Sequence, residues 1–262
     1  MPIARLDSRA LIRVSGPDAR PFLHNLLTQD VESLAEGDLR FGALLSAPGR
    51  LLFDLFIVGE GDDVILDVAA DRRDSLLQRL SMYRLRAKVD IAADDRPVLA
   101  SWPAASEGFM PDPRHENMGG RRLGEGPTVD ATEADYHAHR LAVGLPDPAA
   151  DGGQDVNYPI EADFDLLNGI DFAKGCFVGQ ETTSRMKRRG TVKNRMLPLA
   201  FDGPHPAPGS EVLLNGDRRA GEVLTGVDGL VTALMRLDRL DGVLTVDGRP
   251  VTPRLPDWMP IG

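Results

Sequence analysis

The segment after residue 194 restricts the fold more than any other part of the chain. Short apolar stretches follow one another there, separated by Asn-Gly, Asp-Gly and proline-rich turns: RMLPLAF, EVLLNGDRRAGEVLTGV, LVTALMRL and VLTVDGRPVTPRL. Short strands at this spacing are typical of a small antiparallel barrel or sandwich. We therefore place a boundary near residue 195, with residues 1–194 as one region and residues 195–262 as an all-β unit.

Strand and helix signals are mixed in the first region. Residues 10–14 suit a short strand, and the apolar spacing of residues 22–27 predicts a helix. Residues 39–69 contain three strand-like runs with turns between them. A helix that starts with Asp71 as its N-cap leads into a further strand, and another helix ends at Gly144. This mixture predicts the α+β class.

Composition excludes several classes of protein. A formal net charge of -10 argues against a general nucleic-acid coat protein, so we expect no nucleic-acid partner. No apolar run approaches the roughly 20 residues that span a bilayer, so we expect no membrane association. The first residues show no basic head followed by an apolar block, and the single cysteine excludes an internal disulfide. We therefore predict a cytoplasmic location and a monomer.

The single cysteine lies in the stretch AKGCFVGQETTSRMKRRG, residues 173–190. A lone cysteine is usually a small core residue. Here Gly175 and Gly179 flank Cys176, which indicates tight backbone geometry at a turn or ligand. The cation of Lys174 and a helix that starts near Glu181 would favour the thiolate form. The pattern therefore predicts a partly accessible, reactive thiol.

A run of six cations follows the cysteine in residues 185–195 and begins at Arg185. Such a run is often only the solvated face of a helix. In an acidic chain it would also attract an anion, such as a polyglutamate tail, a phosphate or RNA. The run has no aromatic residues for base stacking, so we favour a small anionic ligand or an acidic protein partner.

Metal-binding and acid–base motifs are absent from the sequence. One thiolate is a poor permanent metal site, and we interpret the scattered histidines as surface or capping residues, so we predict no permanently bound metal. Asp54 interrupts the apolar run LLFDLFIV, which places it at a sheet edge or facing a pocket. Asp74 is explained adequately as a residue of a helix start.

The string KGCFVGQE, residues 174–181, resembles the K-G-C-[FYW]-x-G-Q-E signature of the YgfZ-type folate-binding proteins. These are relatives of the glycine-cleavage T-protein that act in iron–sulfur cluster biogenesis. Three further segments are similar to blocks of that family: LIRVSGPDARPFLHNLLTQDV, GALLSAPGRLLFDLFI and RGTVKNRMLPLAF. The resemblance covers nearly the whole chain and is thin across residues 92–132.

The resemblance implies a three-lobed ring, with two α/β lobes in the N-terminal part and a small β-barrel that closes it. It implies tetrahydrofolate or a related reduced folate near the central hole, with or without a polyglutamate tail. It makes Cys176 the essential group and iron–sulfur client enzymes or assembly proteins the partners. The candidate folate-binding residues are Lys174, Phe177, Gly179, Gln180, Glu181, Arg140, Arg185, Asp54 and Asp74.

Two departures from the T-protein bear on activity. The T-protein motif commonly has an acid where this chain has Cys176, and an asparagine of the T-protein is absent from DVAADRRDSLL. We therefore expect an accessory protein for [4Fe-4S] cluster assembly or maintenance rather than a conventional enzyme. The alternative is a folate-dependent aminomethyltransferase or other one-carbon transferase that uses Asp74 or Asp54. Transient cluster ligation, thiol protection and partner docking all stay open as roles for Cys176.

Overall fold

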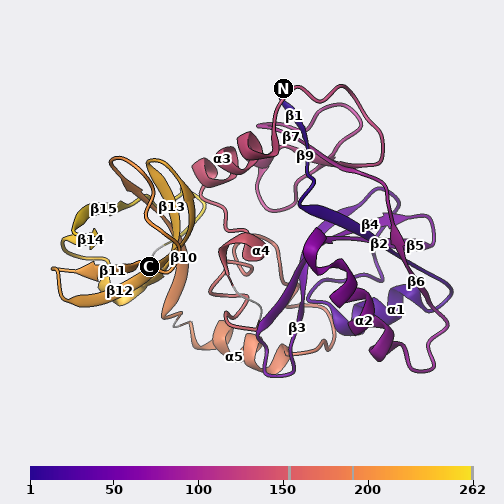
Figure 1. The fold of residues 1–262 in the computed structure, drawn as a ribbon. Helices are drawn as coiled ribbons and strands as arrows, with labels where there is room; N and C mark the ends of the chain where they lie inside the picture. The colour runs from indigo at the N-terminus through magenta and orange to yellow at the C-terminus, as the bar shows by residue number, and fades with distance from the viewer. Residues whose placement is uncertain (153–154, 191, 261–262) are drawn as a thin grey trace.

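Two sheets and a closed barrel form three lobes around the short helix α4 (Pro148–Asp151), as Figure 1 shows. The computed structural model describes residues 1–152, 155–190 and 192–260. No helix in these ranges is long and apolar enough to cross a membrane.

The first lobe is an antiparallel five-stranded sheet in the order β3-β4-β5-β2-β6. Its strands are β2 (Arg9–Ser15), β3 (Leu39–Leu45), β4 (Leu51–Glu60), β5 (Asp63–Ala69) and β6 (Asp90–Asp94). Helices α1 (Ala19–Leu26) and α2 (Arg73–Arg84) pack on it, with Leu23, Leu76 and Leu80 fully buried against the apolar strand residues. The three strands predicted between residues 39 and 69 are confirmed.

The start of α2 differs from the prediction. A 3-10 turn, η1 (Ala70–Arg72), comes before the helix, and Asp71 lies within it. The N-cap of α2 is Arg72, which makes no side-chain cap hydrogen bond. The predicted capping role of Asp71 is therefore wrong, because the tighter turn moves the first helical residue one position along the chain, from Arg72 to Arg73.

The second lobe is a small sheet in the order β1-β7-β9-β8 with helix α3 (Glu133–Val143) beside it. Its strands are β1 (Ile3–Arg5), β7 (Val98–Ser101), β8 (Met110–Pro111) and β9 (Gly120–Leu123), with the 3-10 turn η2 (Glu116–Met118) before β9. Thr132 and Asp135 form a reciprocal capping box at the start of α3. Gly144 ends the helix at φ 82°, as the sequence predicts.

The third lobe is the closed barrel, in the order β10-β13-β12-β11-β14-β15. Its strands are β10 (Asn194–Phe201), β11 (Glu211–Leu214), β12 (Arg218–Val227), β13 (Leu230–Arg236), β14 (Leu244–Val246) and β15 (Arg249–Pro253), and η3 (Leu237–Arg239) follows β13. Pairing of β10 with both β13 and β15 closes it, so neither end strand is left as an open edge. The turns Asn215-Gly216 and Asp247-Gly248 have positive φ at both residues, as tight hairpins require.

Helix α5 (Gln180–Arg189) precedes the barrel and lies beside the β3–β4 turn. A buried cluster ties this region to the first sheet: Phe41 and Phe56 of the sheet pack with Ile160, Phe164 and Phe177. The segment that contains the sequence motif is therefore fixed to the first lobe rather than suspended between lobes.

Candidate functional site

Residues 171–179, which we name the cysteine loop, lie between the turns after α4 and helix α5. Cys176 is exposed in this loop, as are Ala173 and Gly175. The alternative of an inert core cysteine is therefore wrong. Exposure makes the thiol accessible to a reagent, a ligand or another protein.

Lys174 fixes the start of the cysteine loop to helix α1. Its ammonium group donates to the carbonyl oxygen of Leu27 at 2.7 Å and to that of His24. These carbonyls lie at the C-terminal end of α1, where the helix dipole favours a cation. Burial lowers the pKa of Lys174 to about 8, against the opposing effect of nearby acids such as Asp171. Lys174 is thus a loop clamp in this structure, with its charge turned toward α1.

Two adjacent apolar residues hold the middle of the cysteine loop. Phe177 is buried in the cluster around Phe41 and Phe164, and Val178 packs against the main core of the first lobe. The ring of Phe177 also lies 5.1 Å from the Lys174 ammonium group. Because neighbouring side chains enter two different cores, the backbone around Cys176 has little freedom to shift.

Two glycines meet where the cysteine loop passes the β3–β4 turn. Gly179 has φ +80°, and a Cβ there would lie 2.7 Å from the carbonyl oxygen of Ser46 and 2.8 Å from Cα of Gly49. Gly49 has φ +89°, and its own Cβ would lie 3.0 Å from the carbonyl oxygen of Gly179. Both residues are glycine because the two backbones touch.

Thr28 joins the segment LIRVSGPDARPFLHNLLTQDV, in which it lies, to the cysteine loop. Its hydroxyl is fully buried, donates to the carbonyl oxygen of Gly169 at 2.7 Å and accepts from the amide of Ala43 at 2.8 Å. The amide of Asp171 donates to the carbonyl oxygen of Thr28 at 2.9 Å. Segments far apart in sequence thus form one hydrogen-bonded support at the start of the cysteine loop.

The predicted ligand residues at the start of α5 are only lightly engaged. The side-chain amide of Gln180 donates weakly to the carbonyl oxygen of Gly175 at 3.4 Å. Glu181 and Arg185 are exposed. None of the three lines any of the cavities described below.

A cavity of about 340 Å³, which we name the central cavity, lies between the two sheet lobes and α4. It is lined by Ser8, Arg9, Ala69, Ala70, Asp71, His137, Asp147, Ala149 and Ala150. Four alanines give it an apolar wall, and polar groups enter from β2, η1, α3 and the start of α4. An apolar wall with a few converging polar groups is the usual form of a small-molecule site.

Charge is concentrated behind the wall of the central cavity. Arg9 donates to Asp67 at 2.6 Å and to Asp54 at 3.1 Å, and all three side chains are buried. Burial raises the pKa of Asp54, although the charge of Arg9 opposes the change. The sequence predicted that Asp54 lies at a sheet edge or faces a pocket. Neither is the case: Asp54 is buried and pairs with Arg9, which lines the cavity.

Asp147 presents a carboxylate to the central cavity. Burial acts to raise its pKa, but the charges of Arg140 and Arg9 outweigh burial and lower the pKa to about 2. One oxygen of Asp147 accepts from the amide of Ala149 at 3.2 Å. Burial also lowers the pKa of His137, which favours the neutral imidazole. The cavity therefore holds an anionic acceptor beside a neutral ring.

Arg140 supports this wall from behind and does not line the cavity. It is 2% exposed and donates to the carbonyl oxygen of Leu145 at 2.6 Å and to Asp151 at 3.1 Å. Asp151 also accepts from Thr225 of β12. This chain of contacts joins α3, α4 and the barrel.

Asp74 is exposed in the first turn of α2, outside the described cavities. Asp71, three residues earlier, lines the central cavity instead. The one-carbon transferase alternative requires Asp54 or Asp74 as its carboxylate. Asp54 is buried against Arg9, and Asp74 lies on the outer surface.

Sequence reasoning missed Arg9, Asp147 and His137. Arg9 opens an ordinary strand, and Asp147 lies in a turn before a proline, so neither position carries a motif. It also missed the buried cations over Phe56, where the guanidinium carbon of Arg121 lies 3.6 Å from the ring centre. A buried arginine leaves no periodic signal when its partner is far away in the sequence, as Asp67 is 58 positions from Arg9 and 54 from Arg121.

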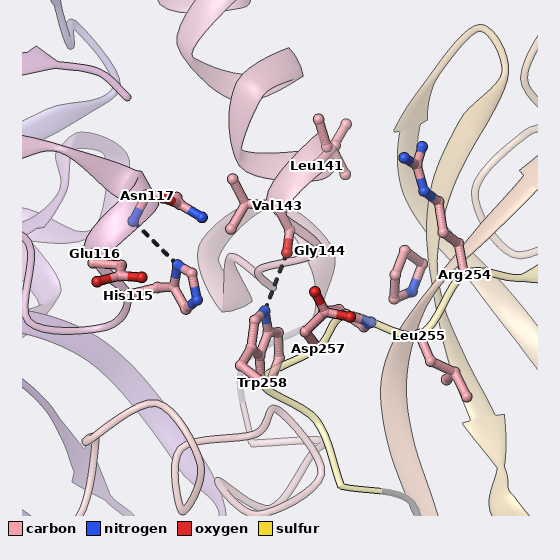
Figure 2. Close-up of a pocket in the computed structure, with 13 residues that line it drawn as sticks. His115, Glu116, Asn117, Leu141, Val143, Gly144, Arg254, Leu255, Asp257 and Trp258 are labelled. Carbon is pink, nitrogen blue, oxygen red and sulfur yellow. Dashed lines mark hydrogen bonds between the residues drawn. The ribbon is translucent and has the colours of Figure 1, made fainter. Parts of the chain in front are cut away.

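Two further cavities lie along the barrel. A cavity of about 540 Å³, which we name the barrel-side cavity, shares Ala149 and Ala150 with the central cavity and extends past Arg72 to β12. Another, of about 430 Å³, lies where the end of α3 meets the C-terminal segment (Figure 2). Figure 2 shows Trp258 there, whose indole N–H donates to the carbonyl oxygen of Val143 at 3.1 Å. No predicted site residue lines either cavity.

Metal-ligand side chains do not cluster in the described ranges: no group of three His, Cys, Asp or Glu is placed there to hold an ion. The expected lack of a permanently bound metal stays a prediction.

Comparison with known proteins agrees with this architecture. Residues 193–261 match the family model of the CAF17 C-terminal beta-barrel domain. The aminomethyltransferase T of the glycine cleavage system from Bartonella henselae superimposes with a TM-score of 0.80 at 16% identity, over 98% of this chain and 86% of that one. This match confirms the predicted fold class of α/β lobes with a C-terminal barrel.

Sequence relatives are more informative about the family. The mitochondrial iron-sulfur cluster assembly factors IBA57 of Homo sapiens and Mus musculus are each 31% identical, over 98% of this chain and 85% of their own length. The Neurospora crassa homologue is 30% identical over 78% of this chain. The predicted cytoplasmic location is wrong by this comparison, because these relatives are named as mitochondrial. The chain belongs to the IBA57 family of iron–sulfur cluster assembly factors.

Proposed function

We propose that this protein acts in [4Fe-4S] cluster assembly or maintenance through the thiol of Cys176, and that it binds a reduced folate in the central cavity. The observation that carries the first part is the exposure of the only thiol on a loop that the Lys174 clamp, the buried Phe177 ring and the Gly179–Gly49 contact hold in place. The family membership supports a role in cluster assembly.

The cysteine count limits how Cys176 can act. A protein-bound [4Fe-4S] cluster normally takes four cysteine thiolates, and this chain supplies one. The cluster is therefore cargo, and the remaining ligands come from an assembly protein or a client enzyme. An exposed thiol suits a shared contact of this kind, because a second protein can reach it without opening the fold.

The central cavity has the size and chemistry for part of a folate. Its volume of about 340 Å³ falls in the range of about 300–1,000 Å³ that is typical of small-molecule sites. Its alanine wall suits a flat ring, and Asp147 offers a carboxylate acceptor to the N–H donors of a pterin. Ser8 and His137 add neutral polar groups at its edge.

The barrel-side cavity suits the tail of the same ligand. It joins the central cavity at Ala149 and Ala150, and Arg72 lines it. One terminal nitrogen of the Arg72 guanidinium is buried without a hydrogen-bond partner in the described part of the chain. The positive charge of Arg72 would attract a glutamate carboxylate. In this proposal Arg140 and Asp54 act as supports of the wall, and the residues from Lys174 to Glu181 belong to the thiol site.

Complementation tests the role of Cys176. Cells that lack their own assembly factor of this family would receive wild-type chain, Cys176→Ser or Ala173→Ser, targeted to the compartment of the missing protein. The control adds the same hydroxyl to a neighbouring exposed position of the loop. We expect [4Fe-4S] enzyme activity to recover with wild type and Ala173→Ser and to stay at the deletion level with Cys176→Ser. Full recovery with Cys176→Ser would end the proposal.

Calorimetric titration with tetrahydrofolate tests the cavity. Asp147→Asn should weaken binding by about tenfold to a hundredfold, the usual effect of losing a hydrogen bond to a charged group. Asp74→Asn should bind like wild type, because Asp74 is exposed outside the described cavities. Equal loss in both variants, or no binding by wild type, would contradict the placement of folate in the central cavity. Cys176→Ser should bind normally, which separates the two parts of the proposal.

A further inference from the structure

Helix α5 carries an exposed face of positive charge, which we name the basic face: Arg185, Lys187 and Arg188. The eleven residues 185–195 hold six of the chain's 30 lysines and arginines and no acid, whereas the whole chain has 40 acidic residues. Arg195 is buried between Asp163 and Asp165, and the other five cations are exposed, so positive charge is concentrated locally against the sign of the molecule. A local field of this kind selects partners of opposite charge.

The helix turns this face away from its own core. Thr183 is fully buried, and Met186 packs against the cluster around Phe41. Arg185 and Arg188 are three residues apart and share one side of the helix. Among the residues that the structure describes, the Arg188 side chain donates one hydrogen bond, to the carbonyl oxygen of Ser184 at 3.4 Å, and Arg188 is exposed.

The basic face continues into the cysteine loop. The ammonium group of Lys187 lies 5.3 Å from the ring centre of Phe172, and the Phe172 residue is 37% exposed. Lys187 also lies 3.7 Å from Asp165, and its side chain remains 47% exposed. Phe172 is four residues before Cys176 in the same loop. Exposed aromatic and arginine side chains together are characteristic of protein–protein contact surfaces.

We propose that the basic face of α5 and Phe172 form a docking surface for an acidic patch of the protein that meets Cys176. The inference rests on the proposed role of Cys176 and adds the chemistry of the partner. Carboxylates of the partner would pair with Arg185 and Arg188, Phe172 would supply an apolar contact, and the partner's cluster-binding region would come to the thiol. Charge complementarity would raise the rate of encounter and set its orientation.

The unique thiol allows a test with defined probes. Synthetic peptides would carry one cysteine as a mixed disulfide with thionitrobenzoate, flanked either by glutamates or by serines. The Cys176 thiolate attacks the peptide sulfur, a peptide–Cys176 disulfide forms, the old disulfide breaks, and thionitrobenzoate leaves as a coloured anion while the thiol proton passes to solvent. Absorbance gives the rate.

In wild type at low salt, the acidic peptide should react at least about tenfold faster than the serine peptide, and 0.5 M salt should remove most of the difference. The double variant Arg185→Gln/Arg188→Gln should bring the ratio of the two rates, acidic to serine peptide, near one. The double variant Arg185→Glu/Arg188→Glu should bring it below one. The matched control Arg84→Gln/Arg86→Gln removes two exposed cations of the first lobe and should keep the wild-type ratio. A ratio near one in wild type, or an unchanged ratio in the α5 variants, would overturn the docking surface.

Complementation separates this inference from the proposed function. If Cys176→Ser is inactive while Arg185→Glu/Arg188→Glu restores full activity, the docking surface is wrong and the thiol role stands. If Cys176→Ser is active, the proposed function itself fails. Unchanged circular dichroism and an unchanged iodoacetamide rate at Cys176 would show that the α5 variants keep their fold. Tight binding of a single-stranded RNA oligonucleotide that only the α5 variants lose would assign the basic face to nucleic acid instead.

Discussion

The contact between Gly179 and the β3–β4 turn is open to a sharp test, because the region around Cys176 contains three glycines in different situations. Gly179 has φ +80° and touches the backbone of Ser46 and Gly49. Gly190 has φ +65° and open space around its missing Cβ. Gly175 has open space and no positive φ. Alanine at Gly175 therefore adds neither backbone strain nor a close contact, alanine at Gly190 adds strain alone, and alanine at Gly179 adds both.

The expected losses follow from these differences. Gly175→Ala should leave the free energy of unfolding unchanged or raise it by about 0.4–1 kcal/mol, because alanine restricts the unfolded chain. Gly190→Ala should lower it by about 1 kcal/mol through left-handed strain alone. Gly179→Ala adds a Cβ at 2.7 Å from a carbonyl oxygen and 2.8 Å from a Cα, which costs about 1–3 kcal/mol more. Its total loss should be about 2–4 kcal/mol.

Urea unfolding followed by circular dichroism and by tryptophan fluorescence would measure the three variants, and agreement of the two signals would establish a single transition. Gly179→Ala should also change the rate at which iodoacetamide alkylates Cys176, since the turn beneath the cysteine loop has to move. Equal losses for Gly179→Ala and Gly190→Ala would refute the reasoning, because the backbone contact would then contribute nothing to stability.

Thr28→Val should lower the free energy of unfolding by about 2–4 kcal/mol, because the buried amide and carbonyl that its hydroxyl joins each lose a partner; Thr28→Ser is the control in urea unfolding. Arg140→Met should cost about 3–5 kcal/mol by leaving Asp151 buried without its cation, and Arg140→Met/Asp151→Asn should recover part of the loss. The folded-state pKa of Asp147, about 2, lies below its ordinary value of 3.8, so its ionisation stabilises the fold above pH 4 and the stabilisation is lost as the pH falls through 2. Wild type should therefore unfold at higher urea than Asp147→Asn at pH 7, and the difference should disappear by about pH 2.

Local sequence signals were reliable where one short segment decides its own conformation. Gly144 ends α3 and Asn215-Gly216 makes a tight hairpin because glycine and asparagine adopt positive φ at low cost, whatever surrounds them. The same reasoning failed at Asp71, where a good capping residue entered a 3-10 turn. At the start of that turn the amide of Ala70 donates to the carbonyl oxygen of Ser8 at 2.7 Å, and capping propensity is worth only about 1 kcal/mol.

For the motif around Cys176, too, the sequence indicated the local conformation but not the tertiary contacts. Its glycines and the lone thiol indicated a special backbone and an accessible sulfur before any fold was known, and exposure of Cys176 agrees. The partners of the motif did not follow from it. Lys174 is directed to the end of α1, some 150 positions earlier in the chain, and Gly179 rests on the β3–β4 turn.

By itself the sequence determined the α+β class, the β-rich C-terminal unit and the position of a distinctive cysteine, because these depend on periodicity, turn residues and residue type. Only the tertiary structure decided that the C-terminal strands close into a barrel, that Asp71 and Asp147 line the central cavity while Asp74 does not, and that Arg140 supports the wall from behind. The physical reason is common to all three. Each depends on contacts between segments distant in sequence, and strand pairing, burial and charge pairing between such segments leave no mark on any one of them.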